Sequence, residues 1–254
     1  MDKYLKQNQI EFSKQAEMIL KSERFNDKKI LEDMLNFCNL KGDEVVLDVA
    51  CGPGIVSTAF AQNVKQVYSL DITDKMVEIC NNLVINNINA VQGSAENLPF
   101  EDQKFDIVVN RLAIHHFHDP SKVLKEMKRV LKVDGMIIIA DIFSSDDKEK
   151  AKLHNSLEYL RDPSHTKMLS LKEFEDLFEE NNLEIIKSKT FEQDCDLEQW
   201  LKITNTEERN SAVECVINKL VEANFDAGID LRKTENEKIE FTHSWVLYRL
   251  GVKK

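Results

Sequence analysis

The chain has 254 residues, 42% of them apolar and 31% charged, and carries a formal net charge of −11. This length supports a sizeable core and predicts one domain, with or without a cap. No apolar run approaches the roughly 20 residues that cross a bilayer, and residues 1–4 open a polar segment and not a signal peptide, so we expect a cytoplasmic protein without a membrane span. The acidic charge repels phosphate backbones, which argues against a nucleic-acid partner.

Residues 1–40 are predicted to form two helices. Apolar residues recur there at helical spacing, first at Phe12, Ala16 and Ile19 and then at Ile30, Met34 and Cys38.

From Glu44 onward, short apolar strands alternate with helices. The predicted strands are 45–49, 66–70, 90–92, 105–109 and 136–140, and the helices between them are 56–62, 75–86 and 121–131. This alternation predicts a parallel sheet that is covered on both faces and has right-handed crossovers. Gly135 is expected to close the third helix as a left-handed C-terminal cap.

After Asp141 the regular alternation ends. We expect helices at 146–162 and 170–182, a strand at 183–190, a helical insertion over 194–225, a charged loop at 224–238 and a final strand at 239–250.

Five cysteines are scattered along the chain, and no two are spaced as C-x-x-C. This odd-numbered set predicts neither a disulfide framework nor a thiolate metal site.

The most informative segment is 45–54, where an apolar strand leads into a turn that contains Gly52 and Gly54. Glycine has no Cβ, so the turn can bend tightly and let an adenosyl cofactor lie against the backbone at the end of the strand. The carboxylate of Asp48, just before the turn, suits a ligand with positive charge.

Three observations concern the adenosyl cofactor, and the last two distinguish between the candidates. Asp71 ends the second predicted strand, where a carboxylate can accept hydrogen bonds from both ribose hydroxyls in either NAD or S-adenosylmethionine. The NAD fingerprint G-x-G-x-x-G is incomplete, because Ser57 occupies the place of the third glycine. Asp48 disfavours a pyrophosphate and fits the ammonium or sulfonium group of S-adenosylmethionine, which is therefore the predicted cofactor.

The segments of residues 44–142 resemble the class I S-adenosylmethionine-dependent methyltransferases. They are similar to the branch of ubiquinone- and menaquinone-biosynthesis C-methyltransferases and its bacterial small-molecule relatives. The resemblance is carried by Val46–Gly54, Asp71, Gly93–Phe100, Phe105–Arg111, Ala113–Phe117, Val130–Lys132 and Gly135. A weaker likeness extends to residues 12–22 and 160–165.

The resemblance implies a Rossmann-like α/β fold, doubly wound around a mostly parallel, seven-stranded sheet. A single methyltransferase domain would span residues 1–254, with an N-terminal helical cap at 1–40 and a cofactor-binding core at 41–142. Residues 143–254 would supply a substrate-side lid with a helical C-terminal insertion and the last strands.

The resemblance also implies roles toward the cofactor. The methionine end would lie on the turn residues Ala50, Cys51, Gly52 and Gly54, with Asp48 near its amino group and Asp71 on the ribose. Ile72 and Met76 would pack on adenine, and Ser94 and Ala95 would line its edge.

Asn110 and Arg111 would close the site through main-chain atoms. Many members of the family have Asp where Ser94 stands, so Glu96 is expected to share the contact with the adenine amino group.

Three histidines follow the fourth predicted strand. In some small-molecule relatives a histidine at the position of His116 resembles a general base, and His115 is the second candidate. Alternatively, one histidine caps the next helix and the other fills core space. A metal held by His115, His116 and His118 is disfavoured, because adjacent residues rarely aim at one ion, so we expect no metal.

The expected lid carries Arg161, Asp162 and His165, which either touch the acceptor or brace the lid. Aromatic residues of the C-terminal third either line an apolar pocket or belong to the core; they are Phe191, Trp200, Phe225 and Trp245.

The predicted function is methyl transfer from S-adenosylmethionine to a small-molecule acceptor, with S-adenosylhomocysteine as product. A monomer or a homodimer is expected. The alternatives are a non-catalytic S-adenosylmethionine-binding regulator and an NAD-dependent oxidoreductase.

Overall fold

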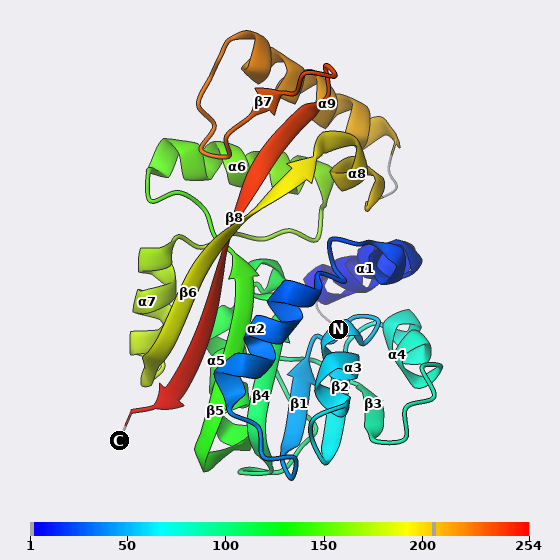
Figure 1. Ribbon diagram of the computed structural model, residues 1–254, viewed down its shortest axis with the longest axis vertical. Helices are drawn as coiled ribbons and strands as arrows, with labels where there is room; N and C mark the ends of the chain where they lie inside the picture. The colour runs from blue at the N-terminus through cyan, green and yellow to red at the C-terminus, as the bar shows by residue number, and fades with distance from the viewer. Residues whose placement is uncertain (1–2, 205–206, 254) are drawn as a thin grey trace.

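A mixed sheet runs the length of the computed structural model, which describes residues 3–204 and 207–253 (Figure 1). Its strands lie in the order β3-β2-β1-β4-β5-β8-β6, and the short β7 pairs with β8. The strands are β1 (Val45–Val49), β2 (Gln66–Asp71), β3 (Ile88–Gln92), β4 (Phe105–Arg111), β5 (Leu131–Ile142), β6 (Leu183–Asp196), β7 (Arg232–Lys233) and β8 (Ile239–Val252). Predictions that fall on residues 1–2, 205–206 and 254 lie outside the described residues.

Strands β1 to β5 pair in parallel, whereas β8 is antiparallel to both β5 and β6. The predicted doubly wound, mostly parallel sheet with seven main strands is therefore confirmed. The order reverses between β1 and β4, and ligands of open α/β sheets bind at such a switch point, outside the carboxyl ends of the strands.

Helices alternate with the parallel strands, and further helices follow in the C-terminal half of the chain. They are α1 (Lys3–Lys21), α2 (Lys28–Cys38), α3 (Ile55–Ala61), α4 (Asp74–Asn81), α5 (Pro120–Val130), α6 (Lys148–Arg161), α7 (Leu171–Glu180), α8 (Leu197–Lys202) and α9 (Glu207–Glu222), with a 3-10 turn η1 (Ile114–His116). Side-chain caps fix several of their starts. Asp119 accepts from the Lys122 N–H at the start of α5, and Ser170 and Glu173 form a capping box at α7.

Apolar residues cover both faces of the parallel part of the sheet. In β5, Ile137 and Ile139 face the cluster formed with α5 and α7, while Ile138 and Ala140 face the cluster formed with α2 and α3. Each fully buried side chain of this kind contributes about 1.5–3 kcal/mol. These two layers hold the carboxyl ends of β1, β2 and β4 in fixed positions.

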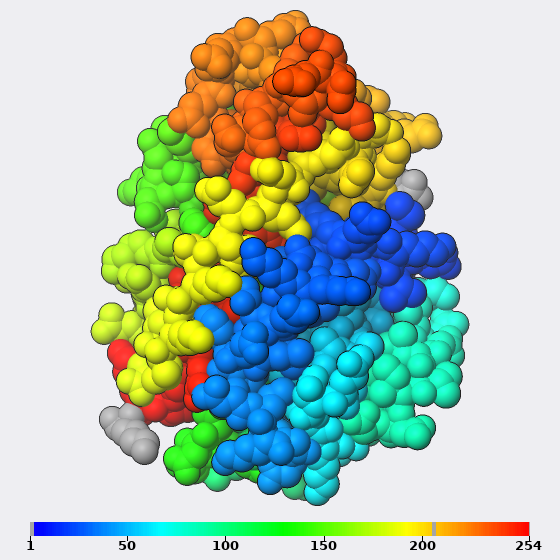
Figure 2. Space-filling view, viewed as in Figure 1, coloured from blue at the N-terminus to red at the C-terminus, as the bar shows by residue number. Residues whose placement is uncertain are grey.

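Strands β6 and β8 continue beyond the parallel strands into a second group of elements (Figure 1). There α6, α8 and α9 pack around Leu157, Trp200, Val213 and Phe241. Helix α1 lies between this group and the ends of the parallel strands, and its segment fills the space between them on the surface (Figure 2).

The prediction for Gly135 is wrong. This residue lies within β5 and does not adopt a left-handed conformation; α5 ends at Val130, and β5 begins at once with Leu131. A Cβ at Gly135 would lie 2.7 Å from the Leu131 side chain and 2.8 Å from the Asp106 carbonyl oxygen. Close packing across the sheet, and not a helix cap, therefore explains the glycine.

Several boundaries also differ. Strand β5 begins at Leu131 instead of 136, and β6 continues to Asp196, past the predicted end at 190 and into the expected helical insertion. Helix α4 ends at Asn81 instead of 86, and the expected loop at 224–238 contains β7. Among the described residues, no helix is both long enough and apolar enough to cross a bilayer.

Candidate active site

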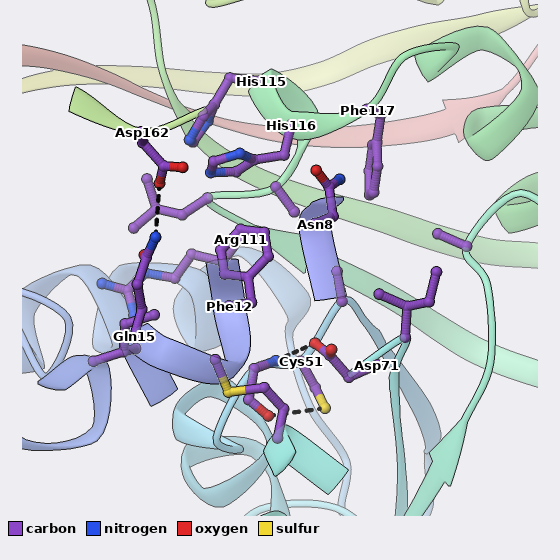
Figure 3. Close-up of a pocket in the computed structure, with 18 of the residues that line it drawn as sticks. Asn8, Phe12, Gln15, Cys51, Asp71, Arg111, His115, His116, Phe117 and Asp162 are labelled. Atoms are coloured by element: carbon purple, nitrogen blue, oxygen red, sulfur yellow. Dashed lines mark hydrogen bonds between the residues drawn. The ribbon is translucent and has the colours of Figure 1, made fainter. Parts of the chain in front are cut away.

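A cavity of about 170 Å³ lies at the carboxyl ends of β1, β2 and β4, beneath α1 (Figure 3). Eleven of the thirteen residues that the sequence analysis assigns to the cofactor line it, together with both candidate bases. They are Asp48, Ala50, Cys51, Gly52, Asp71, Ile72, Met76, Ser94, Ala95, Glu96, Arg111, His115 and His116. The predicted cofactor residues and the candidate bases thus share one cavity.

The glycine turn forms one wall. Ala50, Gly52 and Gly54 all adopt positive φ values, of 56°, 54° and 88°. A Cβ at Gly52 would meet no atom within 4 Å, so its missing side chain leaves open space beside the cavity. Gly54 does not line the cavity, because it packs against α4: a Cβ there would lie 2.8 Å from the Cys80 sulfur.

Asp71 organises the turn as well as facing the cavity. The N–H groups of Gly52 and Thr73 donate to its two carboxylate oxygens, each over 2.9 Å (Figure 3). Each oxygen keeps a further acceptor position. Burial raises the pKa of Asp71, against the hydrogen bonds from Thr73 and Gly52, which lower it.

Asp48 is almost completely buried, with 1% of its surface exposed. The hydroxyl of Ser57 donates to it over 2.6 Å, and that hydroxyl also lies 2.6 Å from the Ser69 hydroxyl. Burial raises the pKa of Asp48 to about 7, more than the Ser57 hydrogen bonds lower it. A cationic group placed beside this carboxylate would compensate the cost of burying its charge.

Ile72 and the buried Met76 supply an apolar wall. The Ser94 hydroxyl accepts the Glu96 N–H over 3.2 Å, and the Glu96 carboxylate pairs with Lys122 over 3.1 Å. Both side chains are thus engaged locally, although both line the cavity.

Asn110 lies behind the cavity wall. Its side-chain amide donates to the Val49 carbonyl over 2.8 Å, which ties β4 to β1, while its Oδ1 atom has no hydrogen-bond partner among the residues that the structure describes. Arg111 does line the cavity, with its guanidinium group buried. Its Nη1 atom donates to the Phe25 carbonyl over 2.7 Å, and burial lowers the pKa of Arg111 to about 10.

His115 and His116 face the cavity but have different partners. His115 Nδ1 lies 2.5 Å from the Asp141 carboxylate. Burial disfavours the charged ring, yet Asp141 outweighs burial and raises the pKa of His115.

His116 Nδ1 lies 3.1 Å from the Ser164 carbonyl oxygen. A carbonyl oxygen only accepts, so Nδ1 carries the proton and Nε2 keeps its lone pair. Burial and the neighbouring His115 charge lower the pKa of His116 to about 4.

The segment around Asp162 is hydrogen-bonded to η1, the turn that carries His115 and His116. Ser164 holds His116, and the His115 carbonyl accepts from the Thr166 N–H over 2.9 Å. Asp162 accepts from Gln15 of α1 over 3.0 Å (Figure 3). These residues therefore brace the lid, while Arg161, Asp162 and His165 also line the cavity.

The four aromatic residues have three different environments. Trp200 lines the cavity, Trp245 is buried in the core and stacks on Phe191, and Phe225 is exposed. Sequence reasoning missed Asn8, Arg24, Glu158 and His243, which also line the cavity. They come from segments outside the 44–142 motifs, and no local pattern marks them.

The strand order, the glycine turn and the cavity at the strand ends together define a Rossmann-like class I methyltransferase fold. Solved structures share this fold. YcgJ from Bacillus subtilis is 28% identical, with a TM-score of 0.80 over 88% of this chain and 98% of YcgJ. A Bacillus halodurans protein classed as a methyltransferase is also 28% identical, with a TM-score of 0.81 over 89% of this chain and 100% of that one.

Sequence comparisons agree. Residues 47–139 match the methyltransferase domain family. The uncharacterised methyltransferase YcgJ of Bacillus subtilis is 34% identical over 199 residues, which are 77% of this chain and 79% of that protein. The ubiquinone/menaquinone C-methyltransferase UbiE of Haemophilus ducreyi is 41% identical over 109 residues, which are 40% of this chain and 42% of UbiE.

The chain therefore belongs to the S-adenosylmethionine-dependent methyltransferases and is related to the UbiE branch, so S-adenosylmethionine is its cofactor. The resemblance stated from the sequence is confirmed. The comparisons favour an enzyme of this class over both the NAD-dependent oxidoreductase and the non-catalytic regulator.

Proposed function

We propose that this enzyme methylates a small molecule bound between α1, the turn η1 and the segment around Asp162. One observation supports this most strongly: Asp71, the glycine turn, His116 and Trp200 all line a single cavity. The cofactor and the acceptor would meet within it, enclosed by α1.

The residues of the cavity fit the cofactor. The free acceptor positions on Asp71 suit two ribose hydroxyls, and buried Asp48, which has no cation within hydrogen-bond distance among the described residues, suits the amino or sulfonium group. The open space at Gly52 accommodates the methionine end, and Ile72 with Met76 offers an apolar surface to adenine. Ala95 would contribute its backbone at the adenine edge.

The sulfonium of the cofactor supplies a methyl group that is already activated. The work of the protein is then to orient the acceptor in line, exclude water and receive a proton where the acceptor carries one. Orientation alone can contribute on the order of 7–11 kcal/mol. Helix α1 and the lid provide the enclosure that this role requires.

We assign the proton-accepting role to His116 and not to His115. His116 has a free Nε2 lone pair, whereas His115 is held by Asp141. The low pKa of His116, about 4, makes the ring a weak base, so it suits an acceptor whose proton is already acidic. His115 and Asp141 then act as a support for the turn.

The test begins with cofactor binding. Isothermal titration of S-adenosylhomocysteine into the wild-type protein should show a single site, and Asp71→Ala should weaken binding by at least about a hundredfold, because ribose bonds to a carboxylate contribute about 1.5–3 kcal/mol each. Glu101→Ala, an exposed acidic change outside the cavity, serves as the control. Absence of binding to the wild type would refute the proposal.

A screen of small-molecule acceptors that follows S-adenosylhomocysteine release should then identify the acceptor and the atom that is methylated. The cytoplasmic location, the monomeric or homodimeric state, the lack of a metal and the single-domain organisation over residues 1–254 stay predictions.

A further inference from the structure

The acceptor end of the cavity contains two guanidinium groups that the function proposed above does not use. Arg24 follows α1, Arg161 ends α6, and both line the cavity. We propose that these two groups bind an anionic substituent, a carboxylate or a phosphate, on the methyl acceptor. This inference rests on the proposed function and names its substrate class.

A chain of hydrogen bonds holds the two groups in place. Arg24 donates to His243 Nδ1, so the His243 proton lies on Nε2 and is donated to Glu158 over 3.0 Å. The other oxygen of Glu158 accepts from Arg161 Nη2 over 2.8 Å. The chain Arg24–His243–Glu158–Arg161 therefore fixes both guanidinium groups at the cavity wall.

Donors outnumber acceptors in this chain. It contains two guanidinium groups and one carboxylate, and its imidazole is neutral because burial lowers the pKa of His243 to about 3. Among the described residues, Arg24 forms no hydrogen bond to a carboxylate, and its buried Nε atom has no hydrogen-bond partner. An anion would supply the missing acceptors.

The carboxylate of Asp162, which also lines the cavity, does not fill this need. Its oxygens accept hydrogen bonds from Ser164 and Gln15. Its interaction with Arg161 is electrostatic and involves no hydrogen bond between the two described side chains. Arg111 adds a third buried cation on the side of Asp48. Among the described residues Arg24 therefore has no carboxylate hydrogen-bonded to it, and an anion at this wall of the cavity would accept from its free donor.

The same chain of bonds argues against a metal ion. His154, Glu158 and His243 place their ligand atoms within 4.8 Å of one another. However, both nitrogens of His243 are engaged, and Arg24 and Arg161 would repel a cation on either side. An anion fits this arrangement and a metal does not.

The surroundings indicate an acceptor with an apolar body. The Arg161 guanidinium stacks on Trp200, 4.3 Å from the ring centroid, and Phe25 and Ile203 also line the cavity. The Trp200 Nε1 atom is buried and has no hydrogen-bond partner within residues 3–204 and 207–253. A small aromatic carboxylate matches both the guanidinium groups and this apolar lining.

The experiment titrates three probes into protein saturated with S-adenosylhomocysteine, at fixed ionic strength: benzoate, its neutral analogue benzamide, and inorganic phosphate. Wild-type protein should bind benzoate at least tenfold more tightly than benzamide. Arg24→Gln and Arg161→Gln should each weaken benzoate binding at least tenfold and leave the affinity for S-adenosylhomocysteine within threefold. Arg232→Gln, which lies outside the cavity, is the matched control and should change neither.

The probes also distinguish the two anions: phosphate binding tighter than benzoate would identify a phosphorylated acceptor. Arg24→Lys and Arg161→Lys keep the positive charge and are used in place of a Gln variant that fails to fold. The Lys variants should lose less affinity for benzoate than the Gln variants. Equal binding of benzoate and benzamide, or benzoate binding that the variants do not weaken, would overturn the proposal. Loss of S-adenosylhomocysteine binding in step with benzoate would also overturn it, because the arginines would then serve the cofactor. Failure of the proposed function is a separate outcome, in which the wild type binds no S-adenosylhomocysteine.

Discussion

Asp48 couples cofactor binding to pH. Its pKa of about 7 in the cofactor-free protein means that it is largely protonated below pH 6, whereas a cation beside it favours the charged carboxylate. Affinity for S-adenosylmethionine should therefore rise about tenfold between pH 6 and pH 8, with release of a proton. Titration calorimetry in buffers of different ionisation enthalpy measures both effects.

The stability of the free protein should change in the opposite direction. The folded pKa of Asp48 lies above its unfolded value of 3.8, so this group's contribution to stability is present below pH 3.8 and is lost as the pH rises through about 7.

Asp48→Asn should remove the pH dependence of binding. An unchanged slope in that variant would assign the effect to another group.

The pKa values of His115 and His116 should be shifted in opposite directions, although the two residues are adjacent. The pKa of His116 is lowered to about 4 and that of His115 is raised by Asp141. In a ring-nitrogen NMR titration, His116 should stay neutral down to about pH 5, with His116→Gln as the assignment control. Because its folded pKa lies below 6.5, His116 should contribute stability that is lost as the pH falls from 6.5 toward 4. Protonation near pH 6.5 would contradict this.

At the scale of elements, α1 is attached to both ends of the cavity. Gln15 donates to Asp162 on the lid side, and Gln9 donates to the Ile72 carbonyl on the adenine side over 2.7 Å. Each bond of this kind contributes about 0.5–1.5 kcal/mol, or more where a carboxylate accepts. We therefore expect that α1 releases these bonds when the bound cofactor leaves.

The double variant Gln9→Ala with Gln15→Ala should therefore release S-adenosylhomocysteine at least several-fold faster, as measured by stopped-flow displacement. Glu17→Ala changes an exposed residue of the same helix, 70% exposed at its side chain, and should leave the rate unaltered. Equal rates in the double variant and the wild type would show that α1 does not limit release.

Local patterns predicted most elements of the parallel sheet. Strand β1 spans Val45–Val49 as predicted, because its apolar run ends in turn residues. Strand β5 was placed too late and Gly135 was misjudged, since the close contact with Asp106 depends on a neighbouring strand that the local sequence does not reveal. Local periodicity finds an element but not the partner that sets its ends.

The residues of the candidate site also divide into those that a local sequence pattern marks and those that only tertiary packing brings together. Eleven of the thirteen predicted cofactor residues line the cavity, because all of them except Met76 on α4 stand at a strand end or in the turn that follows it. Arg24, Glu158 and His243 could not be found in that way. They lie on a linker, a helix and the last strand, and only the packing of these three segments brings them together.

At the scale of the whole molecule, β6 and β8 pass through both the cofactor half and the lid half. Their continuous ladder predicts that the two halves unfold together. Single-tryptophan variants test this, since Trp200 reports on the lid and Trp245 on the core. In each of the variants Trp200→Phe and Trp245→Phe, the urea midpoint followed by fluorescence of the remaining tryptophan should coincide with the midpoint followed by far-UV circular dichroism. Separate midpoints would indicate an independently unfolding lid.

The antiparallel strand β8 also sets the order in which the sheet can be completed during synthesis. Every other strand of the described sheet precedes it on the chain, yet β8 lies between β5 and β6, and β6 has no other strand partner. While the ribosome still holds residues 239–252, β5 and β6 each present an open edge, and such edges invite pairing with other chains. The nascent protein therefore passes through an aggregation-prone interval, and the acidic residues of its last third provide charge repulsion during that time.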